Sequence, residues 1–246
     1  MKNLLLIFFL LWTGSALAAD SDQTVKAVSF KPGSKGTTLQ GQIRGRQYVD
    51  YQLRAAAGQT LKASFKSAHR AAYFNLLPPE SRDAAMYVGQ DDDKHFEGLL
   101  PTDGLYTLRV YLMRSAARRN EAASYTLEIS VTGKPLKPLP GSIDARVPGT
   151  LYHATTTVPC TLAYSPPREC DAGVIRRGHD GTATVEIKWQ TEGGPAMRRI
   201  LFVKGEPKAA DTFQPMSFTK NARGETKVLF GGDESFLLPE ALMSGG

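Results

Sequence analysis

The sequence predicts an all-β protein in which an N-terminal antiparallel β-sandwich is followed by a second, small β-rich domain with one disulfide. Three observations lead to this fold class. Short segments alternate bulky or β-branched residues with polar ones. Turn-forming residues rich in glycine, proline and aspartate separate these segments at short intervals. A proline-rich stretch, residues 132–142, divides the chain near its middle, and such a stretch suits an extended linker better than a strand.

The strands of the first part are expected from this alternation. Within residues 59–65, Leu61, Ala63 and Phe65 fall on one face of the segment, as they would in a strand packed on a core. Several such strands between short turns are typical of a small sandwich. The other segments expected to be strands in this part are 48–53, 73–77, 105–112 and 124–131.

The second part shows the same alternation, most clearly in residues 181–189. Two more strands are expected at 198–205 and 226–230, separated by glycine-rich turns. Residues 236–242 fit either a last strand or a short helical turn. We therefore expect four segments in the chain: a signal peptide (1–19), the sandwich (20–131), the linker (132–142) and a β-rich domain of unknown function (143–246).

The N-terminus predicts export. Lys2 precedes the apolar run 4–12, and small residues around Ala18 and Ala19 follow, which is the pattern of a secretory signal peptide. The run is shorter than the roughly 20 residues that cross a bilayer. A buried N-terminal helix is the alternative. We expect a periplasmic or secreted protein without a membrane span.

The two cysteines, Cys160 and Cys170, both lie in the part expected to be exported. An oxidising compartment favours a disulfide between them over two free thiols. Two cysteines and the scattered His69, His95, His153 and His179 do not make a metal-ligand set, so no metal is expected.

Charge and motifs argue against several function classes. The chain carries a formal net charge of +6, spread over both parts, which is too little to indicate nucleic-acid binding. It contains no nucleophile elbow, no H-E-x-x-H motif and no phosphate-binding glycine loop. Asp91, Asp92 and Asp93 resemble a calcium loop only superficially, and a solvated acidic loop is expected there. We expect no catalytic site and no cofactor.

The connection between the strands 105–112 and 124–131 is unusual. It is longer than the two to five residues that a tight hairpin needs. It also carries Arg114, Arg118 and Arg119 between small residues. Exposed arginines on a loop are usually only solvated, but a guanidinium group can also bind a carboxylate with two hydrogen bonds. Arg109 lies inside a strand, where its stem is expected to cover apolar surface.

Residues 28–131 resemble the periplasmic inhibitors of goose-type (g-type) lysozyme from Gram-negative bacteria. The clearest stretch is LPTDGLYTLRVYLMRSAARRNEAASYTLEISV, preceded by VSFKPGSKGTTLQGQIRGRQYVDYQLRAAAGQ. In the first stretch the family pattern matches Gly104, Tyr106, Leu108, Arg109, Val110, Arg114, Arg118, Asn120 and Tyr125. In the second it matches Phe30, Gly41, Ile43, Gly45, Tyr48, Tyr51, Gly58 and Gln59.

The resemblance implies a β-sandwich that inserts loops into the active-site cleft of a lysozyme. It assigns the contact to Tyr48, Arg114 and Arg118, with Asn120 in the same loop motif. It matches residues 65–98 only loosely, and the family ends near Val131. The added part, 143–246, resembles a segment of exported proteobacterial proteins that has no assigned activity.

Two other functions fit the sequence. The sandwich could be a binding module for a glycan or a peptide without inhibitory activity, since one fold serves many ligands. Such a module would more often show a line of exposed aromatic rings than an arginine loop. An enzyme with an unfamiliar site is the other alternative, although no group of residues points to it. The sequence leaves the oligomeric state open.

Overall fold

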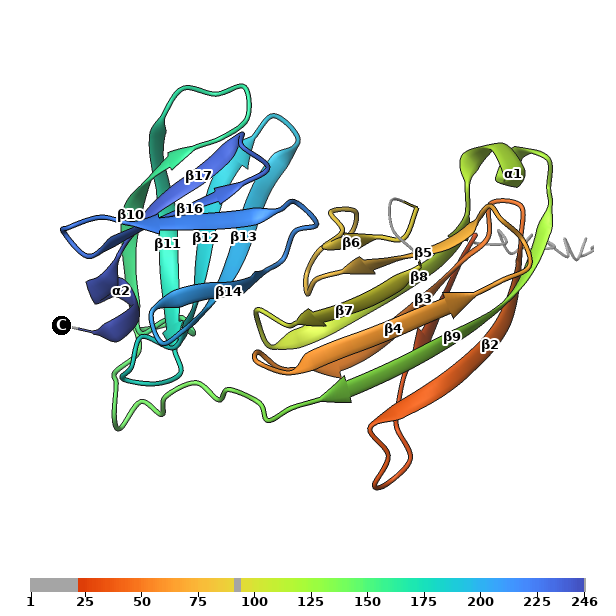
Figure 1. The fold of residues 1–246 in the computed structure, drawn as a ribbon, viewed down its shortest axis with the longest axis horizontal. Helices are drawn as coiled ribbons and strands as arrows, with labels where there is room; N and C mark the ends of the chain where they lie inside the picture. Colours follow the sequence, from red (N-terminus) through yellow and green to blue (C-terminus); the bar gives the residue numbers. More distant parts are fainter. Residues whose placement is uncertain (1–21, 91–93, 246) are drawn as a thin grey trace, which may run out of the picture.

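The computed structural model of the chain describes residues 22–90 and 94–245. The predicted signal peptide, 1–19, and the acidic run 91–93 lie outside the described residues. Seventeen strands and two five-residue helices make up the regular structure of the described part, so the prediction of an all-β fold is confirmed (Figure 1). No helix within 22–90 and 94–245 has both the length and the apolar character needed to cross a membrane.

The first half of the chain forms two sheets packed face to face. A five-stranded sheet has the order β1-β3-β8-β5-β6, and a four-stranded sheet has the order β2-β9-β4-β7. All neighbours pair antiparallel except β1, which runs parallel to β3 at the sheet edge. The strands are β1 (Gln23–Ala27), β2 (Gly36–Arg44), β3 (Tyr48–Ala55), β4 (Thr60–Lys66), β5 (Ala72–Leu77), β6 (Tyr87–Val88), β7 (His95–Leu99), β8 (Gly104–Leu112) and β9 (Ala122–Thr132).

Alternation along each strand builds the core between these sheets. In β3, for example, Val49, Tyr51 and Leu53 point inward and are at most 6% exposed. Each such side chain contributes about 1.5–3 kcal/mol by leaving water. The hydroxyl groups of Tyr51 and Tyr125 are 2.8 Å apart inside this core, which satisfies two buried polar groups at once. Gly41 makes room for Tyr125, because a Cβ at position 41 would collide with its ring.

The second half forms one sheet of eight antiparallel strands with the order β14-β13-β12-β11-β10-β17-β16-β15. Side chains from one face of this curved sheet, together with helix α2 (Glu240–Ser244), enclose a separate apolar core. The strands are β10 (Ala154–Thr161), β11 (Arg168–Arg176), β12 (Ala183–Thr191), β13 (Gly194–Val203), β14 (Glu206–Ala210), β15 (Met216–Lys220), β16 (Glu225–Phe230) and β17 (Glu234–Pro239).

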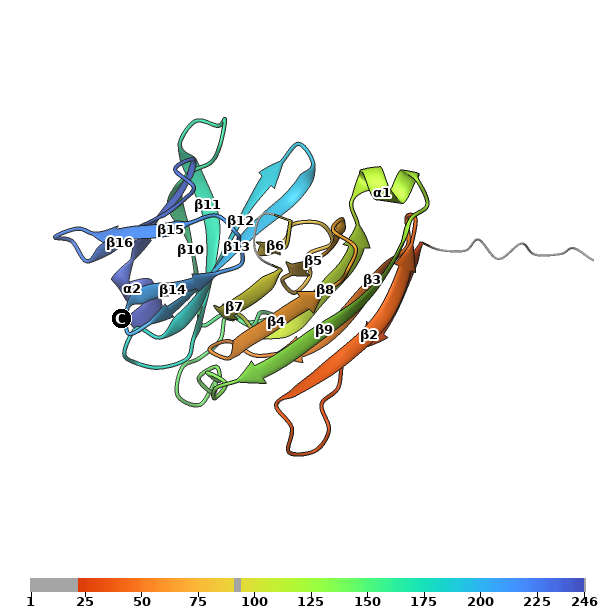
Figure 2. The same ribbon diagram turned by 45° about the vertical axis from the view of Figure 1, so that its right-hand side comes forward.

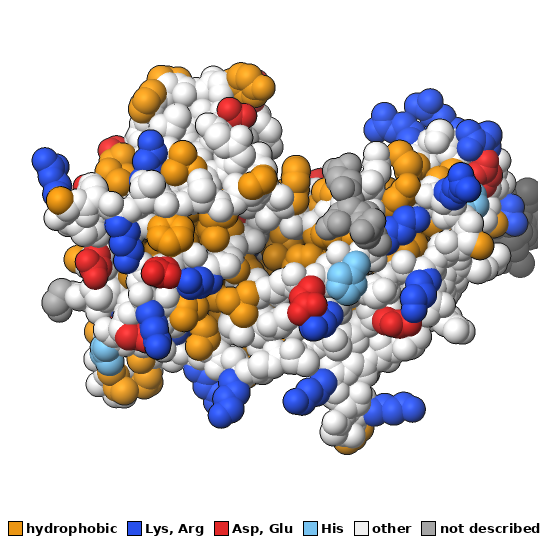
Figure 3. Space-filling view, in the orientation of Figure 1, with side chains coloured by type: hydrophobic (Ala, Val, Ile, Leu, Met, Phe, Trp, Pro, Cys, Tyr) orange, Lys and Arg blue, Asp and Glu red, His pale blue; other side chains and the backbone are white. Residues whose placement is uncertain are grey.

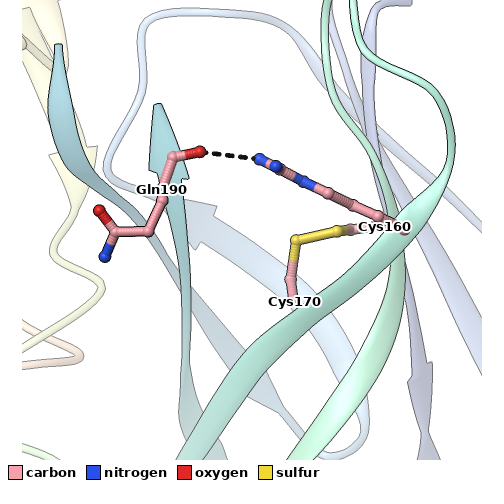
Figure 4. Close-up of a disulfide and its surroundings, with 4 residues drawn as sticks. Cys160, Cys170 and Gln190 are labelled. Atoms are coloured by element: carbon pink, nitrogen blue, oxygen red, sulfur yellow. Dashed lines mark hydrogen bonds between the residues drawn. A yellow bond between two sulfur atoms is a disulfide. The ribbon is translucent and has the colours of Figure 1, made fainter. Parts of the chain in front are cut away.

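The predicted disulfide is present and joins neighbouring strands of the second half. Cys160 on β10 and Cys170 on β11 are 3% and 2% exposed, and their Cα atoms are 5.9 Å apart. Figure 4 shows the bond beside the hydrogen bond of 3.0 Å that Arg168 donates to the backbone oxygen of Gln190. The disulfide therefore closes the β10–β11 hairpin at the edge of the second core.

Replacing Cys160 and Cys170 together by serine is expected to lower the free energy of unfolding by about 2–3 kcal/mol. The bond closes a loop of about ten residues, and the loss of that cross-link gives the unfolded chain more freedom. Urea unfolding of the oxidised protein and of the variant measures the difference. The reduced wild-type protein is the control and should match the variant. Equal midpoints for oxidised protein and variant would contradict the expectation.

The segment between the halves is attached to both of them. No residue of 133–153 lies in a strand or helix. Leu136 donates a backbone hydrogen bond of 2.9 Å to Ala57 of the sandwich, and Leu139 donates one of 2.8 Å to Arg176 of the second half. The proline-rich segment is therefore held along its length. The boundaries 131/132 and 142/143 remain predictions.

Two buried arginines of the second half bind the sandwich. The side chain of Arg177 is 0% exposed, and its Nη1 donates to the carboxylate of Asp103 at 3.0 Å and to the backbone oxygen of Leu136. Burial lowers the pKa of the Arg177 guanidinium group. Arg199, 6% exposed, donates to the backbone oxygen of Pro79 at 2.9 Å. Buried charges with such partners fix the two halves to each other.

These contacts lie at one end of the sandwich. Asp103 directly precedes β8, which ends at Leu112 just before helix α1 (Arg114–Arg118). The second half and α1 therefore occupy opposite ends of the sandwich, as Figures 1 and 2 show. The second half does not cover α1.

Candidate functional site

The arginine-rich connection, which the sequence predicted as a long loop, contains a helical turn. Helix α1 covers Arg114–Arg118, and Ala116 within it is 0% exposed and belongs to the sandwich core. The alanines favour a helix, and their small size lets the helix lie close to the strands. Arg114 and Arg118 are four residues apart and therefore share one face, which is exposed.

Helix α1 rests on the turn between β2 and β3. The backbone nitrogen of Gly45 donates to the backbone oxygen of Glu121 at 2.9 Å, and Arg44 donates to the backbone oxygen of Asn120 at 3.3 Å. Gly45 has a φ of +59°, and a Cβ there would come within 2.6 Å of the Asn120 side chain. Glycine is required for this close approach. The helix is thus held in a fixed position.

Asn120 ends the helix. Its φ of +53° is left-handed, a conformation that asparagine tolerates better than most residues, and its backbone nitrogen donates to the oxygen of Ala117 at 3.1 Å. Its side chain is exposed. The structure therefore gives Asn120 a structural position beside the predicted contact residues, and its predicted role in partner binding stays a prediction.

A shallow depression of about 600 Å³ lies beside α1. It is lined by Arg46, Gln90, Tyr111, Leu112, Met113, Arg114, Ala117 and Arg118. Three guanidinium groups therefore surround one concave surface. Figure 3 shows Lys and Arg side chains gathered over the α1 end of the molecule. Such a concentration of one charge attracts anionic groups of a partner.

The three arginines of this depression have no partners among the described residues. Within 22–90 and 94–245, the side chains of Arg46, Arg114 and Arg118 form no ion pair and no hydrogen bond. Among these residues, no contact has to be broken before their donors bind a ligand. A planar guanidinium group suits carboxylates, to which it donates two parallel hydrogen bonds.

Arg119 differs from its neighbours. Its Nε lies 2.5 Å from Glu121, which also contacts His69 at 2.9 Å. The hydrogen bond from Arg119, followed by that of His69, holds the pKa of the Glu121 carboxyl below its usual range. Arg119 is thus partly neutralised within the chain. This agrees with its omission from the predicted contact residues.

Tyr48 lies at the same end of the sandwich as α1. Val49 and Val110 face each other in the β3–β8 ladder and point into the core, so Tyr48 and Tyr111 stand side by side on the outer face of the sheet. Tyr111 lines the depression. The structure therefore brings three predicted contact residues, Tyr48, Arg114 and Arg118, to one surface.

An ion pair between Arg109 and the buried carboxylate of Asp50 lies beside Tyr48. Arg109 donates two hydrogen bonds, of 2.8 and 2.9 Å, to Asp50, whose side chain is only 4% exposed. Gln23 of the edge strand donates a third to the same carboxylate at 2.8 Å. The guanidinium group of Arg109 lies 4.8 Å from the centre of the Tyr48 ring. That the stem of Arg109 covers apolar surface stays a prediction, while its guanidinium group pairs with Asp50 and that hydrogen bond raises its pKa.

Arg46 and Asp50 belong to this site but were not predicted from the sequence. Arg46 is adjacent to the turn glycine Gly45 and two residues before Tyr48, and that proximity was an available signal. Asp50 is a carboxylate at the centre of an otherwise apolar and aromatic strand, and such a residue generally has a buried partner. In the part of the chain that the structure describes, no three His, Cys, Asp or Glu side chains are grouped as a metal site would require.

Comparison with known proteins decides the family. No family model matches the sequence. The inhibitor of g-type lysozyme from Escherichia coli K12 is 30% identical over 131 residues, which are 53% of this chain and 94% of that protein. The chain belongs to the family of g-type lysozyme inhibitors. This confirms the resemblance seen in the sequence.

Two solved structures of g-type lysozyme inhibitors are also similar. PliG of Aeromonas hydrophila, a periplasmic lysozyme inhibitor of g-type lysozyme, is 32% identical and covers 45% of this chain and 97% of its own, with a TM-score of 0.42. PliG of Salmonella Typhimurium, described in the same words, is 28% identical and covers 44% and 97%, with a TM-score of 0.37. The g-type lysozyme inhibitor matches cover the N-terminal part of the chain.

Proposed function

We propose that this chain inhibits a g-type lysozyme in the periplasm by placing the α1 end of its sandwich in the cleft of the enzyme. The observation that carries the proposal is the depression at α1, where Arg46, Arg114 and Arg118 converge without partners among residues 22–90 and 94–245. The relative from Escherichia coli is an inhibitor of g-type lysozyme. Inhibition of this kind needs no cofactor and no reaction.

The physical basis is charge and shape complementarity. A lysozyme cleft contains catalytic carboxyl groups and is concave. Helix α1 projects from the free end of the sandwich (Figure 1). Arg114 and Arg118 lie on its exposed face. Once α1 is inserted, the guanidinium groups of Arg114 and Arg118 lose their bound water and donate to carboxylate oxygens instead. The cleft then contains little water. Tyr48 adds a flat apolar ring with one hydroxyl at the edge of the same surface.

A glycan-binding module is less well supported. Sugar rings stack on exposed aromatic faces, and the outer face of the five-stranded sheet carries Tyr48, Tyr111 and Tyr73 on neighbouring strands. None of these rings is fully exposed. Arg109 lies 4.8 Å from the centre of the Tyr48 ring, and Lys94 lies 4.3 Å from the centre of the Tyr73 ring, so a cation already occupies one face of each of these two. The free donors of the surface are guanidinium groups, which favour an anionic partner.

The test follows the clearing of a murein suspension by a g-type lysozyme in the presence of the expected mature chain, residues 20–246. We expect clearing to stop when inhibitor and enzyme are equimolar at micromolar concentration. Raising the salt concentration should weaken inhibition, since charged contacts guide association. Chicken-type and invertebrate-type lysozymes serve as controls and should remain active. Unchanged clearing at a large excess of the protein would contradict the proposal.

A further inference from the structure

Arg199 reaches from the second half into the sandwich. Its Nε is held by Glu186 of its own sheet at 2.9 Å. The other end of the guanidinium group crosses the boundary, where Nη1 donates to the backbone oxygen of Pro79 at 2.9 Å and Nη2 to the carboxylate of Glu80 at 2.6 Å. Because the side chain of Glu80 is 75% exposed, the buried bond to Pro79 is the stronger anchor.

Arg199 contacts the first two residues of the segment 79–83. The backbone conformation of this segment has to be stabilised by neighbouring residues. Glu80 has a φ of +66°, a left-handed conformation that is unfavourable for a residue other than glycine. Ser81 closes the turn with a hydrogen bond of 2.7 Å to the backbone oxygen of Ala84. Strained turns of this kind persist when their surroundings hold them in place.

The same segment contacts the residue that holds Tyr48. The backbone oxygen of Arg82 accepts a hydrogen bond of 3.1 Å from Nη1 of Arg109, and Asp83 lies 3.8 Å from the same atom. Arg109 uses its other two nitrogens on Asp50 and faces the ring of Tyr48. A continuous series of contacts therefore connects the second half with a predicted contact residue of the sandwich.

We propose that the second half positions the Tyr48 part of the lysozyme-binding surface, with Arg199 fixing residues 79–83 so that they hold Arg109 against Tyr48. Arg199 and Arg109 are positioning residues in this arrangement, and Tyr48 makes the contact. The inference rests on the proposed function. It gives the added half a role in binding although that half lies at the opposite end of the sandwich from α1.

Arg177 provides a matched control within the same interface. It is equally buried, and its partners in the sandwich region are Asp103 and the backbone oxygen of Leu136. Neither partner touches Arg109 or Tyr48 in the described part of the chain. A change at Arg177 therefore loosens the contact between the halves without interrupting the series that leads to Tyr48.

The experiment compares Arg199→Lys with Arg177→Lys in the full mature chain. Lysine keeps the charge but cannot donate to several partners through a planar fork. We expect Arg199→Lys to bind a g-type lysozyme about 2- to 30-fold more weakly, the range of coupling through a protein interior. Arg177→Lys should bind like the wild type, although both variants lose thermal stability.

A double-mutant cycle separates positioning from a general loss of stability. In a Tyr48→Ala background, Arg199→Lys should cause no further loss of affinity, since the contact it positions is gone. In an Arg114→Ala background it should cause its full loss. The proposal would be overturned if Arg199→Lys lost the same affinity in both backgrounds. It would also be overturned if Arg199→Lys bound like the wild type, or if Arg177→Lys lost as much affinity as Arg199→Lys.

A second readout needs no lysozyme. The NMR signal of the Arg109 Nε–H group reports on its bond to Asp50, and we expect it to shift in Arg199→Lys but not in Arg177→Lys. An unchanged signal in Arg199→Lys would overturn the positioning role. If the wild-type chain fails to inhibit g-type lysozymes, the proposed function fails, while the Arg109 signal still decides whether the second half positions this residue.

Discussion

Replacing Arg114 and Arg118 together by alanine is expected to weaken binding to a g-type lysozyme by about thirtyfold to several thousandfold. Removing a charged partner from a desolvated, hydrogen-bonded pair costs about 2–5 kcal/mol of binding free energy, which corresponds to that range. Most of the loss should appear as faster dissociation. Titration of enzyme activity and surface-binding kinetics measure the two quantities.

The same double substitution should leave the fold unchanged. Arg114 and Arg118 are exposed and without partners among the described residues, and alanine is the better helix former. The melting temperature of the variant should therefore equal that of the wild type or exceed it slightly. Weaker inhibition can then be attributed to the lost contact.

Arg119→Ala is the matched control for this prediction. Arg119 directly follows α1 but is paired with Glu121. We expect its removal to change the affinity by less than about threefold, as for a solvated charge at the rim of an interface. If Arg119→Ala weakened inhibition as much as the double variant, the effect would reflect net charge and not the depression at α1.

Asp103→Ala is expected to lower the free energy of unfolding by about 2–4 kcal/mol. The substitution leaves the guanidinium group of Arg177, whose side chain is 0% exposed, without its carboxylate. Asp103 itself is 43% exposed, so water screens the pair and the loss is smaller than for a pair with both partners buried. The Nη2 atom of Arg177 already has no hydrogen-bond partner among the described residues. The substitution also removes the hydrogen bond of 2.9 Å that the backbone nitrogen of Ala57 donates to Asp103. Urea unfolding measures the loss.

Two variants control this second prediction. Asp103→Asn keeps an oxygen for the Ala57 nitrogen and removes only the charge, so its loss should be smaller. Asp83→Ala removes a carboxylate that is 95% exposed and should change the unfolding free energy by less than about 0.5 kcal/mol. If Asp103→Ala lowers the unfolding free energy no more than Asp83→Ala does, water replaces the carboxylate of Asp103 as the partner of Arg177 and the prediction is wrong.

Most strands of the sandwich could be predicted because each meets the core with one face. The pattern of Leu61, Ala63 and Phe65 in residues 59–65 matches β4, where all three are buried. The alternation did not predict strands β1, β2, β6, β7, β10, β11, β14 and β15. Of these, β1, β14 and β15 are five residues long and lie at sheet edges, and all residues of β1 are exposed, so alternation leaves little trace in their sequences.

The candidate site was predicted only in part. Arg114 and Arg118 could be singled out because they lie in a connection that is too long for a hairpin and because the family resemblance assigns the contact to them. The helical form of that connection was not predicted, since a five-residue helix depends on tertiary packing more than on its own propensity. Here Ala116 enters the core, and the turn at Gly45 supports the helix end. Arg46 joins the site through the same turn.

The sequence alone determined the all-β class, the pairing of Cys160 with Cys170 and the resemblance to g-type lysozyme inhibitors, because alternation, cysteine number and local motifs are written along the chain. Only the tertiary structure decided that Arg177 and Arg199 are buried between the halves and that Asp50 holds Arg109 against Tyr48. These contacts join residues that are 59 to 120 positions apart in the sequence. The pair of Asp50 and Arg109 also depends on the register of the β3–β8 ladder, which the whole sheet determines. A charged residue in a strand has the same local sequence signature whether it faces water or a buried partner, and the packing of distant strands decides between the two.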